Sequence, residues 1–303
     1  MIMRLIGDTN IPFVAKRGLF FSLSGLLMLA SIAVVIIRGG FNYGVDFTGG
    51  SMVQVHFTQP VSTDAVRGAL EKLGEGGAGL QRDDRGDFLI RVKPREFSGK
   101  ETFTTVMRRQ FETSFPGNQF EILRDEMVGP QVSKELQGKV LLAVLLGLVG
   151  ILIYVSFRFD FRFGTGAVLS LVHDTLITLG FVALFNKEVT ITLIAALLTV
   201  IGYSVNDSIV VSDRIREDVR KMRKESFFDV CNHAINKTLS RTIITALTTL
   251  FVTLALLVFG AASIKDFAFV MTVGIVVGTY SSVFIVANFV AEWEKKFPSK
   301  RRR

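Results

Sequence analysis

One carboxylate, that of Asp207, lies in a stretch of sequence that is otherwise apolar enough to cross a lipid bilayer. A charged carboxylate near the hydrocarbon costs about 2.5–3.5 kcal/mol on insertion scales, so an intramembrane Asp marks a functional position. Ser204, Asn206 and Ser208 crowd the same turn. We therefore predict a polar site inside a membrane helix, where this carboxylate takes up and releases a charge during transport.

Two further groups of polar residues also lie inside apolar runs. His173 and Asp174 are adjacent, about ten residues into one run, and Arg241 opens another. Arg241 and Asp207 both fall near the same end of their runs, so we expect them to lie at similar depth and to meet. A neighbouring guanidinium favours the charged form of a buried carboxylate, and its withdrawal favours the protonated form. Such a pair suits a proton carrier that is driven by conformational change.

Each of these residues also has a purely structural interpretation. Asp207 could be a helix-end carboxylate in cytoplasmic water, because Asp213 and Arg214 follow it closely. Arg241 taken alone is typical of a residue that extends its charge to the membrane surface. His173 and Asp174 could form a hydrogen-bonded pair that bridges helices.

The composition indicates a membrane protein. Of the 303 residues 49% are hydrophobic, the mean hydropathy is +0.44, and the single cysteine excludes an internal disulfide. The net charge of +8 is unevenly placed: residues 38–138 hold 13 Lys and Arg against 14 Asp and Glu. The excess cations flank apolar runs, which is typical of membrane topology and argues against a nucleic-acid partner.

Six apolar runs are each long enough to cross about 30 Å of hydrocarbon. The predicted spans are 18–37, 139–157, 164–185, 189–211, 241–260 and 266–291. The first is interpreted as a retained span and not as a cleaved signal peptide, because its apolar run continues and five others follow.

Loop charges predict the orientation of these spans. The N-terminal segment 1–17, the 158–162 loop, the 212–240 connector and the tail 292–303 are all basic, which places them in the cytoplasm. Both termini are then cytoplasmic, and residues 38–138 lie outside, in the periplasm of a host with two membranes.

The segment between the first two spans has the patterning of a small folded domain. Alternating residues predict strands at 51–57, 79–82, 87–92 and 118–123, and amphipathic stretches predict helices at 62–73 and about 98–114. This βαββαβ order indicates a ferredoxin-like fold. The predicted fold class is thus a six-span α-helical membrane protein with a small α+β periplasmic domain between spans one and two.

Several kinds of chemistry are disfavoured. The sequence has no phosphate-binding G-x-x-x-x-G-K-[ST] loop, and its His and Cys residues lack zinc spacing. We therefore expect no ATP-driven or metal-assisted chemistry, no cofactor, and no hydrolytic activity within this chain.

Four motifs together resemble the SecF family of bacterial protein-export subunits, which is related to the resistance-nodulation-division transporters. They are the segments 44–50 (GVDFTGG), 173–174 (HD), 202–217 (GYSVNDSIVVSDRIRE) and 239–243 (LSRTI). The match runs through nearly the whole chain, and the third motif is the most specific. Ser133 departs from the pattern, because the family often has Gly there.

The resemblance implies partners and an energy source. The expected partners are SecD, which would be a separate chain with the same six-span plan, the SecYEG channel, YajC, the translocating polypeptide and the lipid bilayer of the bacterial inner membrane. The expected driving force is the proton motive force, or sodium in some members, used to complete translocation at the outer face.

The resemblance also assigns roles to residues. Asp207 and Arg241 fall on the charge-relay pair of the family, and Asn206, Ser204, His173 and Asp174 would support it inside the membrane. The remaining motif positions are expected to be structural: Gly44, Asp46, Gly49, Gly50, Gly202, Asp213 and Arg214.

Two other functions remain open from the residues alone. A purely structural scaffold of a channel assembly would use the small-residue face of Gly274 and Gly278 for complex formation. Half of a small-molecule efflux pump would need a broad apolar cleft in the outer domain, and about one hundred residues look too few for that.

Overall fold

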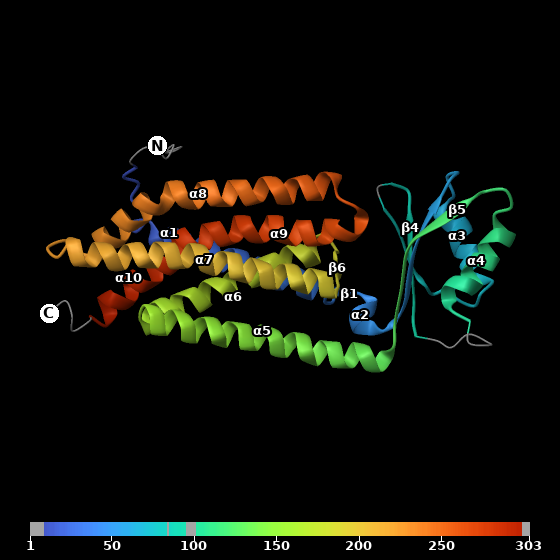
Figure 1. Ribbon diagram of the computed structural model, residues 1–303, viewed down its shortest axis with the longest axis horizontal. Helices are drawn as coiled ribbons and strands as arrows, with labels where there is room; N and C mark the ends of the chain where they lie inside the picture. Colours follow the sequence, from blue (N-terminus) through green and yellow to red (C-terminus); the bar gives the residue numbers. More distant parts are fainter. Residues whose placement is uncertain (1–8, 84, 95–100, 299–303) are drawn as a thin grey trace. The chain divides into compact units, whose positions relative to one another are not determined.

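The computed structural model describes residues 9–83, 85–94 and 101–298, so the first eight residues of segment 1–17 and the last five of the tail lie outside the described ranges. The chain divides into two compact units (Figure 1). One consists of Met1–Asn42 and Leu142–Arg303, and the other of Tyr43–Leu141.

Six helical segments are long and apolar enough to cross a membrane, as the sequence predicts. They are α1 (Arg17–Ile37), α5 (Pro130–Arg158), α6 (Phe161–Leu184), α7 (Ile191–Lys221), α8 (Phe227–Phe259) and a last segment made of α9 (Ala262–Ser281), the π-helix η2 (Ser282–Val286) and α10 (Ala287–Lys296).

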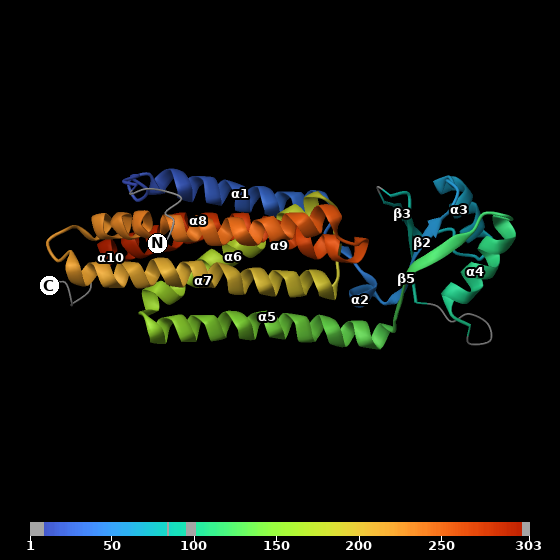
Figure 2. The same cartoon turned by 45° about the horizontal axis from the view of Figure 1, so that its top comes forward.

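Helices α6, α7 and the α9–α10 segment form the interior of the bundle. About half of each span is buried, against 11% for α1, 6% for α5 and 17% for α8. Helix α1 packs on α6, and α8 packs on both α7 and α9; both views show α8 running along α9 (Figures 1 and 2). The outer helices therefore leave apolar faces free for lipid or for a partner's helices.

The helices extend beyond the predicted spans, most clearly around the 212–240 connector. Helix α7 continues to Lys221 and α8 begins at Phe227, after Ser226 accepts a hydrogen bond from the backbone N–H of Asp229. Hydropathy marks only the stretch that contacts hydrocarbon, whereas helical hydrogen bonding continues as long as side chains support it. The connector is thus mostly helix, with a turn at 222–226.

The second unit has the predicted element order β-α-β-β-α-β. Its elements are β2 (Gly50–Phe57), α3 (Thr63–Glu71), β3 (Gly79–Arg82), β4 (Phe88–Val92), α4 (Phe103–Ser114) and β5 (Phe120–Val128). Helix α4 begins after its cap Thr102, later than predicted, and residues 95–100 lie outside the described part of the chain.

These strands form one antiparallel sheet in the order β3-β4-β2-β5. Strand β2 is central, and its alternate residues Val53, Val55 and Phe57 are buried in a core shared with both helices. The Phe57 and Phe111 rings lie 5.7 Å apart in this core. Period-two patterning in the strands and helical patterning in α3 and α4 place these apolar side chains on one face of the sheet.

Three short elements complete the description: β1 (Asn42–Tyr43), α2 (Val45–Thr48) and β6 (Glu188–Val189).

Candidate functional site

Asp207 lies on the buried face of α7. Val200, Ser204, Asp207 and Val211 are 2%, 1%, 3% and 0% exposed, so the predicted helical stripe faces the interior of the bundle. Residues three and four apart share one face of a helix, which is why this stripe is continuous. Burial within the protein removes the alternative in which Asp207 is an exposed helix-end carboxylate.

Several buried oxygens on the packed helices α7 and α8 have no hydrogen-bond partner within the described ranges, and three of them belong to Asp207 and to two small hydroxyl residues. These three are Oδ2 of Asp207, Oγ of Ser208 and Oγ1 of Thr242. A buried polar atom without a partner costs roughly 1–3 kcal/mol, so a native structure usually supplies a water, an ion or a proton at such a place.

Arg241 is exposed on α8, next in sequence to the buried Thr242. Because Oδ2 of Asp207 has no hydrogen-bond partner in the described part of the chain, the guanidinium is not bonded to it. The expectation that Arg241 and Asp207 work as a pair therefore stays a prediction.

Asn206 and Gly202 do not belong to this buried group. Both are exposed on α7, and an added Cβ at Gly202 would meet nothing within 4 Å. Adjacent residues of an α-helix point about 100° apart, so Asn206 faces away although it precedes Asp207. The expectation that Asn206 supports the carboxylate stays a prediction, and the structure places Asn206 on the exposed face of α7.

His173 and Asp174, which the sequence suggested as a pair, form a hydrogen bond of 2.9 Å between Nδ1 and Oδ1. Oδ2 of Asp174 accepts two more hydrogen bonds, from Ser204 of α7 at 2.6 Å and from Ser281 of α9 at 2.7 Å. Ser170 donates to Ser281 at 2.8 Å. All five residues are at most 2% exposed. We call these five residues the Asp174 cluster.

Sequence reasoning missed Ser281, the cluster's α9 member. Its signal was present, since Ser281 shares a helix face with Gly278 and Gly274, where small residues allow close helix approach. An added Cβ at Gly278 would lie 3.1 Å from Cβ of Ser204 and 3.6 Å from Oδ2 of Asp174. The small-residue face thus packs inside this chain, against α7 and α6.

Asp213 and Arg214 lie on the extension of α7 beyond the predicted span. Asp213 accepts from Arg216 at 3.3 Å, and Arg214 donates to Asp218 at 3.0 Å. Asp218 is 1% exposed and also contacts Nδ1 of His233 at 2.8 Å. The two motif residues therefore help to hold the helical connector together.

The glycine motif at 44–50 forms the turn that leads into β2. Gly44 caps α2, whereas Gly49 and Gly50 have φ values of 71° and 115° that only glycine adopts readily. A Cβ on Gly50 would collide with the carbonyl oxygen of Val92. Asp46 lies in the first turn of α2, where its charge complements the helix dipole.

Ser133, the position that departs from the family pattern, lies against this motif. Its side chain is 2% exposed, and its hydroxyl donates toward the carbonyl oxygens of Gly129 and Val45 at 3.3 and 3.4 Å. Gln137 donates to the carbonyl oxygen of Phe47 at 2.6 Å. The start of α5 therefore carries the polar partners of the motif's backbone.

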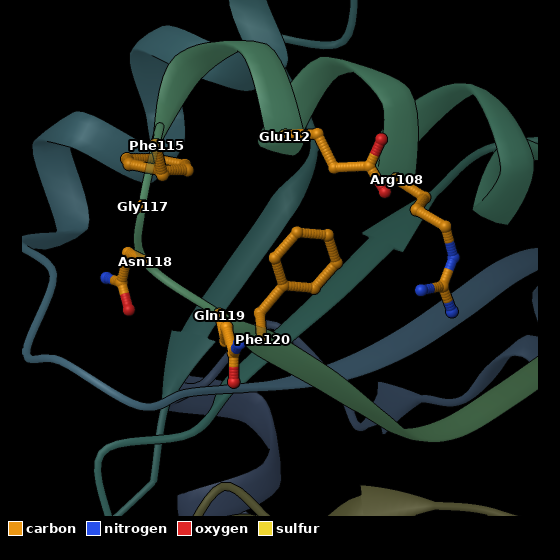
Figure 3. Close-up of a pocket in the computed structure, with 7 residues that line it drawn as sticks. All are labelled: Arg108, Glu112, Phe115, Gly117, Asn118, Gln119 and Phe120. Carbon is orange, nitrogen blue, oxygen red and sulfur yellow. The ribbon is translucent and has the colours of Figure 1, made fainter.

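A surface pocket of about 440 Å³ lies in the second unit (Figure 3). Figure 3 shows the Phe120 ring below helix α4, which contributes Arg108 and Glu112. Asn118 and Gln119 supply further polar groups. A pocket with this mixed lining is not the broad apolar cleft that the efflux alternative requires.

Comparison with known proteins identifies the family. The family model described as "Protein export membrane protein SecD/SecF, C-terminal" matches residues 108–296, and the model "SecD/SecF GG Motif" matches residues 34–61. The protein translocase subunit SecF of Calditerrivibrio nitroreducens is 44% identical, over 93% of this chain and 94% of its own length. Protein translocase subunit SecF of Escherichia coli O157:H7 is 40% identical over 88% of this chain.

Solved structures agree with this assignment. A crystal structure of SecDF, a translocon-associated membrane protein from Thermus thermophilus, matches 95% of this chain with a TM-score of 0.86 and 39% identity. A SecDF structure in a super-membrane-facing form matches 96% with a TM-score of 0.70. This chain spans 39% and 40% of those two SecDF chains. By its sequence and its fold alike, the chain belongs to the SecF family of multi-pass protein-translocase subunits.

Proposed function

We propose that this chain works with SecD to drive the late stage of protein translocation, using the proton motive force. The observation that carries the proposal is Asp207: a carboxylate buried in a membrane bundle, one oxygen of which has no protein partner in the described ranges. Holding that charge away from water is costly, and protonation removes the charge. The packing of α7 against α8 would then differ between the two protonation states.

The coupling ion is proposed to be a proton. A protonated carboxyl gains a donor while keeping its acceptor capacity, and Ser208 and Thr242 place two further buried hydroxyls on the same pair of helices. Arg241 would approach Asp207 when the proton leaves and withdraw when it returns. The same oxygens are ligands that sodium accepts, so the experiment below separates the two ions.

The proposed assembly follows from the family. A SecDF relative from Thermus thermophilus joins both subunits in one chain, of which this chain covers 37%, which supports SecD as the partner here. SecYEG, YajC and the translocating polypeptide are proposed as further partners. The chain would need no bound cofactor and no hydrolytic activity of its own.

The proposed location is the bacterial inner membrane, with both termini in the cytoplasm. Basic residues at the ends of α5, α7 and α10 support this orientation. The outer unit would then be periplasmic. The antiparallel strand order β3-β4-β2-β5 with two helices supports a ferredoxin-like domain.

Translocation in proteoliposomes that contain SecD, this chain and the channel tests the proposal. Asp207→Asn and Arg241→Met should each abolish the part of translocation that depends on the proton gradient. Asp160→Asn, at an exposed acidic residue that precedes α6 and makes no side-chain cap bond there, is the control and should retain activity. Full activity of both relay variants would refute the proposal. Loss that is rescued by a sodium gradient would assign sodium.

The scaffold alternative is less well supported. It required the Gly274 and Gly278 face for contact with a partner, but this face packs against Val200 and Ser204 of the same chain. Substitutions there are expected to disturb this bundle itself.

A further inference from the structure

The Asp174 cluster joins three helices through one carboxylate. His173 and Ser170 come from α6 with Asp174 itself, Ser204 comes from α7, and Ser281 comes from α9. A carboxylate only accepts hydrogen bonds, so His173 donates through Nδ1, and both Ser204 and Ser281 donate to Oδ2. The acceptor is shared, and removal of either serine hydroxyl would leave the other in place.

These bonds are short, buried and charge-assisted. The two serine bonds measure 2.6 and 2.7 Å, and every member of the cluster is at most 2% exposed. Hydrogen bonds to an ionised group are stronger than neutral ones, and burial from water strengthens them further. The cluster therefore restrains sliding or rotation of α7 against α6 and α9.

The restraint acts close to Asp207. Ser204 lies three residues before Asp207 on the same buried stripe, so a rotation of α7 that moves one must move the other. Gly278 lets α9 approach this point, because its missing side chain leaves room beside Ser204 and Asp174.

The α9 side of the cluster adjoins an irregular helix. Ser281 is the last residue of α9, and the π-helix η2 begins at the next residue. Single-turn π segments inside α-helices often occur at functional sites, where an extra residue per turn offers an alternative register. The His173 ring of α6 stacks on Tyr280 of α9, with the ring centroids 6.1 Å apart. The Tyr280 hydroxyl in turn donates to the carbonyl oxygen of Phe20 in α1. The cluster thus reaches a fourth helix.

We propose that Asp174 is a positioning residue of the transport cycle. Through Ser204 and Ser281 it latches α7 to α6 and α9 in the arrangement seen here, and this latch opens when Asp207 changes its charge. The inference rests on the proposed function of Asp207 and adds the element that converts its charge change into helix movement.

The test measures proton flux and translocation together in the proteoliposomes that also contain SecD and the channel. Ser204→Ala and Ser281→Ala remove one donor each. Loss of a hydrogen bond to a charged group shifts an equilibrium by roughly tenfold or more. In these variants α7 should therefore move without moving α6 and α9. We expect translocation per proton taken up to fall by about tenfold, while the proton flux is retained or rises.

Ser212→Ala is the matched control. Ser212 is a 2% exposed serine on the same helix, but its hydroxyl donates to the carbonyl oxygen of Ser208 within α7. A merely structural role would lower flux and translocation together and leave their ratio unchanged, and that result would overturn the inference. The inference would also be overturned if Ser204→Ala and Ser212→Ala showed the same translocation per proton taken up.

Asp207→Asn separates this inference from the proposed function. If Asp207→Asn is inactive while the two serine variants keep the normal ratio, the latch is refuted and the relay stands. If Asp207→Asn is fully active, the relay fails, and the latch fails with it. When both the relay and the latch are correct, adding Ser204→Ala to Asp207→Asn should change translocation no further. The reason is that no charge change at Asp207 remains to be transmitted.

Discussion

Gly274→Ala tests the close approach of α9 to α7 on which the cluster depends. An added Cβ would lie 2.5 Å from Cγ1 and 3.0 Å from Cβ of Val200, whereas carbon atoms pack at about 3.5–4.0 Å. Either the helices separate or Val200 leaves its rotamer. Overpacking of this kind costs roughly 1–3 kcal/mol, against about 1 kcal/mol gained when Ala replaces Gly in a helix. We expect a net loss of up to about 2 kcal/mol.

Gly202→Ala is the matched control, because Gly202 is helical and an added Cβ there meets nothing within 4 Å. It should gain about 1 kcal/mol, so the two variants should differ by roughly 1–3 kcal/mol. The assay is the unfolding midpoint of the purified full chain in detergent. Val200→Ala removes both Cγ atoms, so the double variant with Gly274→Ala should be more stable than the sum of the single effects. Equal midpoints for the two glycine variants, or strict additivity in the cycle, would refute this account of the packing.

Three further predictions concern other parts of the fold. Gly50→Ala should prevent folding of the second unit, because the left-handed backbone alone costs about 1–3 kcal/mol and the added Cβ meets Val92. Protease resistance of residues 43–141 in the membrane-embedded chain measures this, and an unchanged digestion pattern would count against it. Asp87→Ala removes the acceptor of the side-chain hydrogen bonds from Gln54 and His56 of β2, which should destabilise that strand by about 1–3 kcal/mol. Hydrogen exchange along β2 should accelerate, and unchanged protection would contradict this. Asn236→Ala removes both hydrogen bonds to the backbone of Ile11 and should make residues 9–16 sensitive to protease while translocation persists; if cleavage is as slow as in the parent chain, these bonds are not what holds the segment.

Periodicity carried the sequence-based predictions furthest. The stripe of Ser204, Asp207 and Val211 is buried because residues three and four apart share a helix face, and that spacing is visible in one dimension. The βαββαβ order was equally accessible, since period-two and helical patterns differ in kind. Asn206 shows the limit: proximity in sequence does not mean a shared face. The helical connector shows a second limit of prediction from sequence. Hydropathy indicates which part of a helix contacts hydrocarbon, but it does not indicate where the helix ends.

Contacts between helices were the part that could not be predicted. Ser281 and Ser204 meet at Asp174 although 77 positions separate them in the sequence. The sequence around one serine does not predict its contact with the other serine, because a serine in a helix can equally bond to its own backbone, as Ser212 does. Ser281 makes both kinds of bond, since its hydroxyl also lies 3.1 Å from the carbonyl oxygen of Gly278, and only the packing of α6 against α9 brings it to Asp174.

The packing also distinguishes Asp174 from Asp207, two of the buried carboxylates of the bundle. Asp174 receives three hydrogen bonds from side chains, so the protein itself supplies its partners. Asp207 is buried almost as deeply, yet its Oδ2 has no partner among the described residues. The hydrogen bonds of Asp174 join three helices, whereas Asp207 lacks such bonds at Oδ2, and this difference is why we propose a positioning role for the first and a relay role for the second. Because Ser204 and Asp207 share one buried stripe of α7, the proposed relay at Asp207 and the proposed latch at Asp174 would be joined by a single helix.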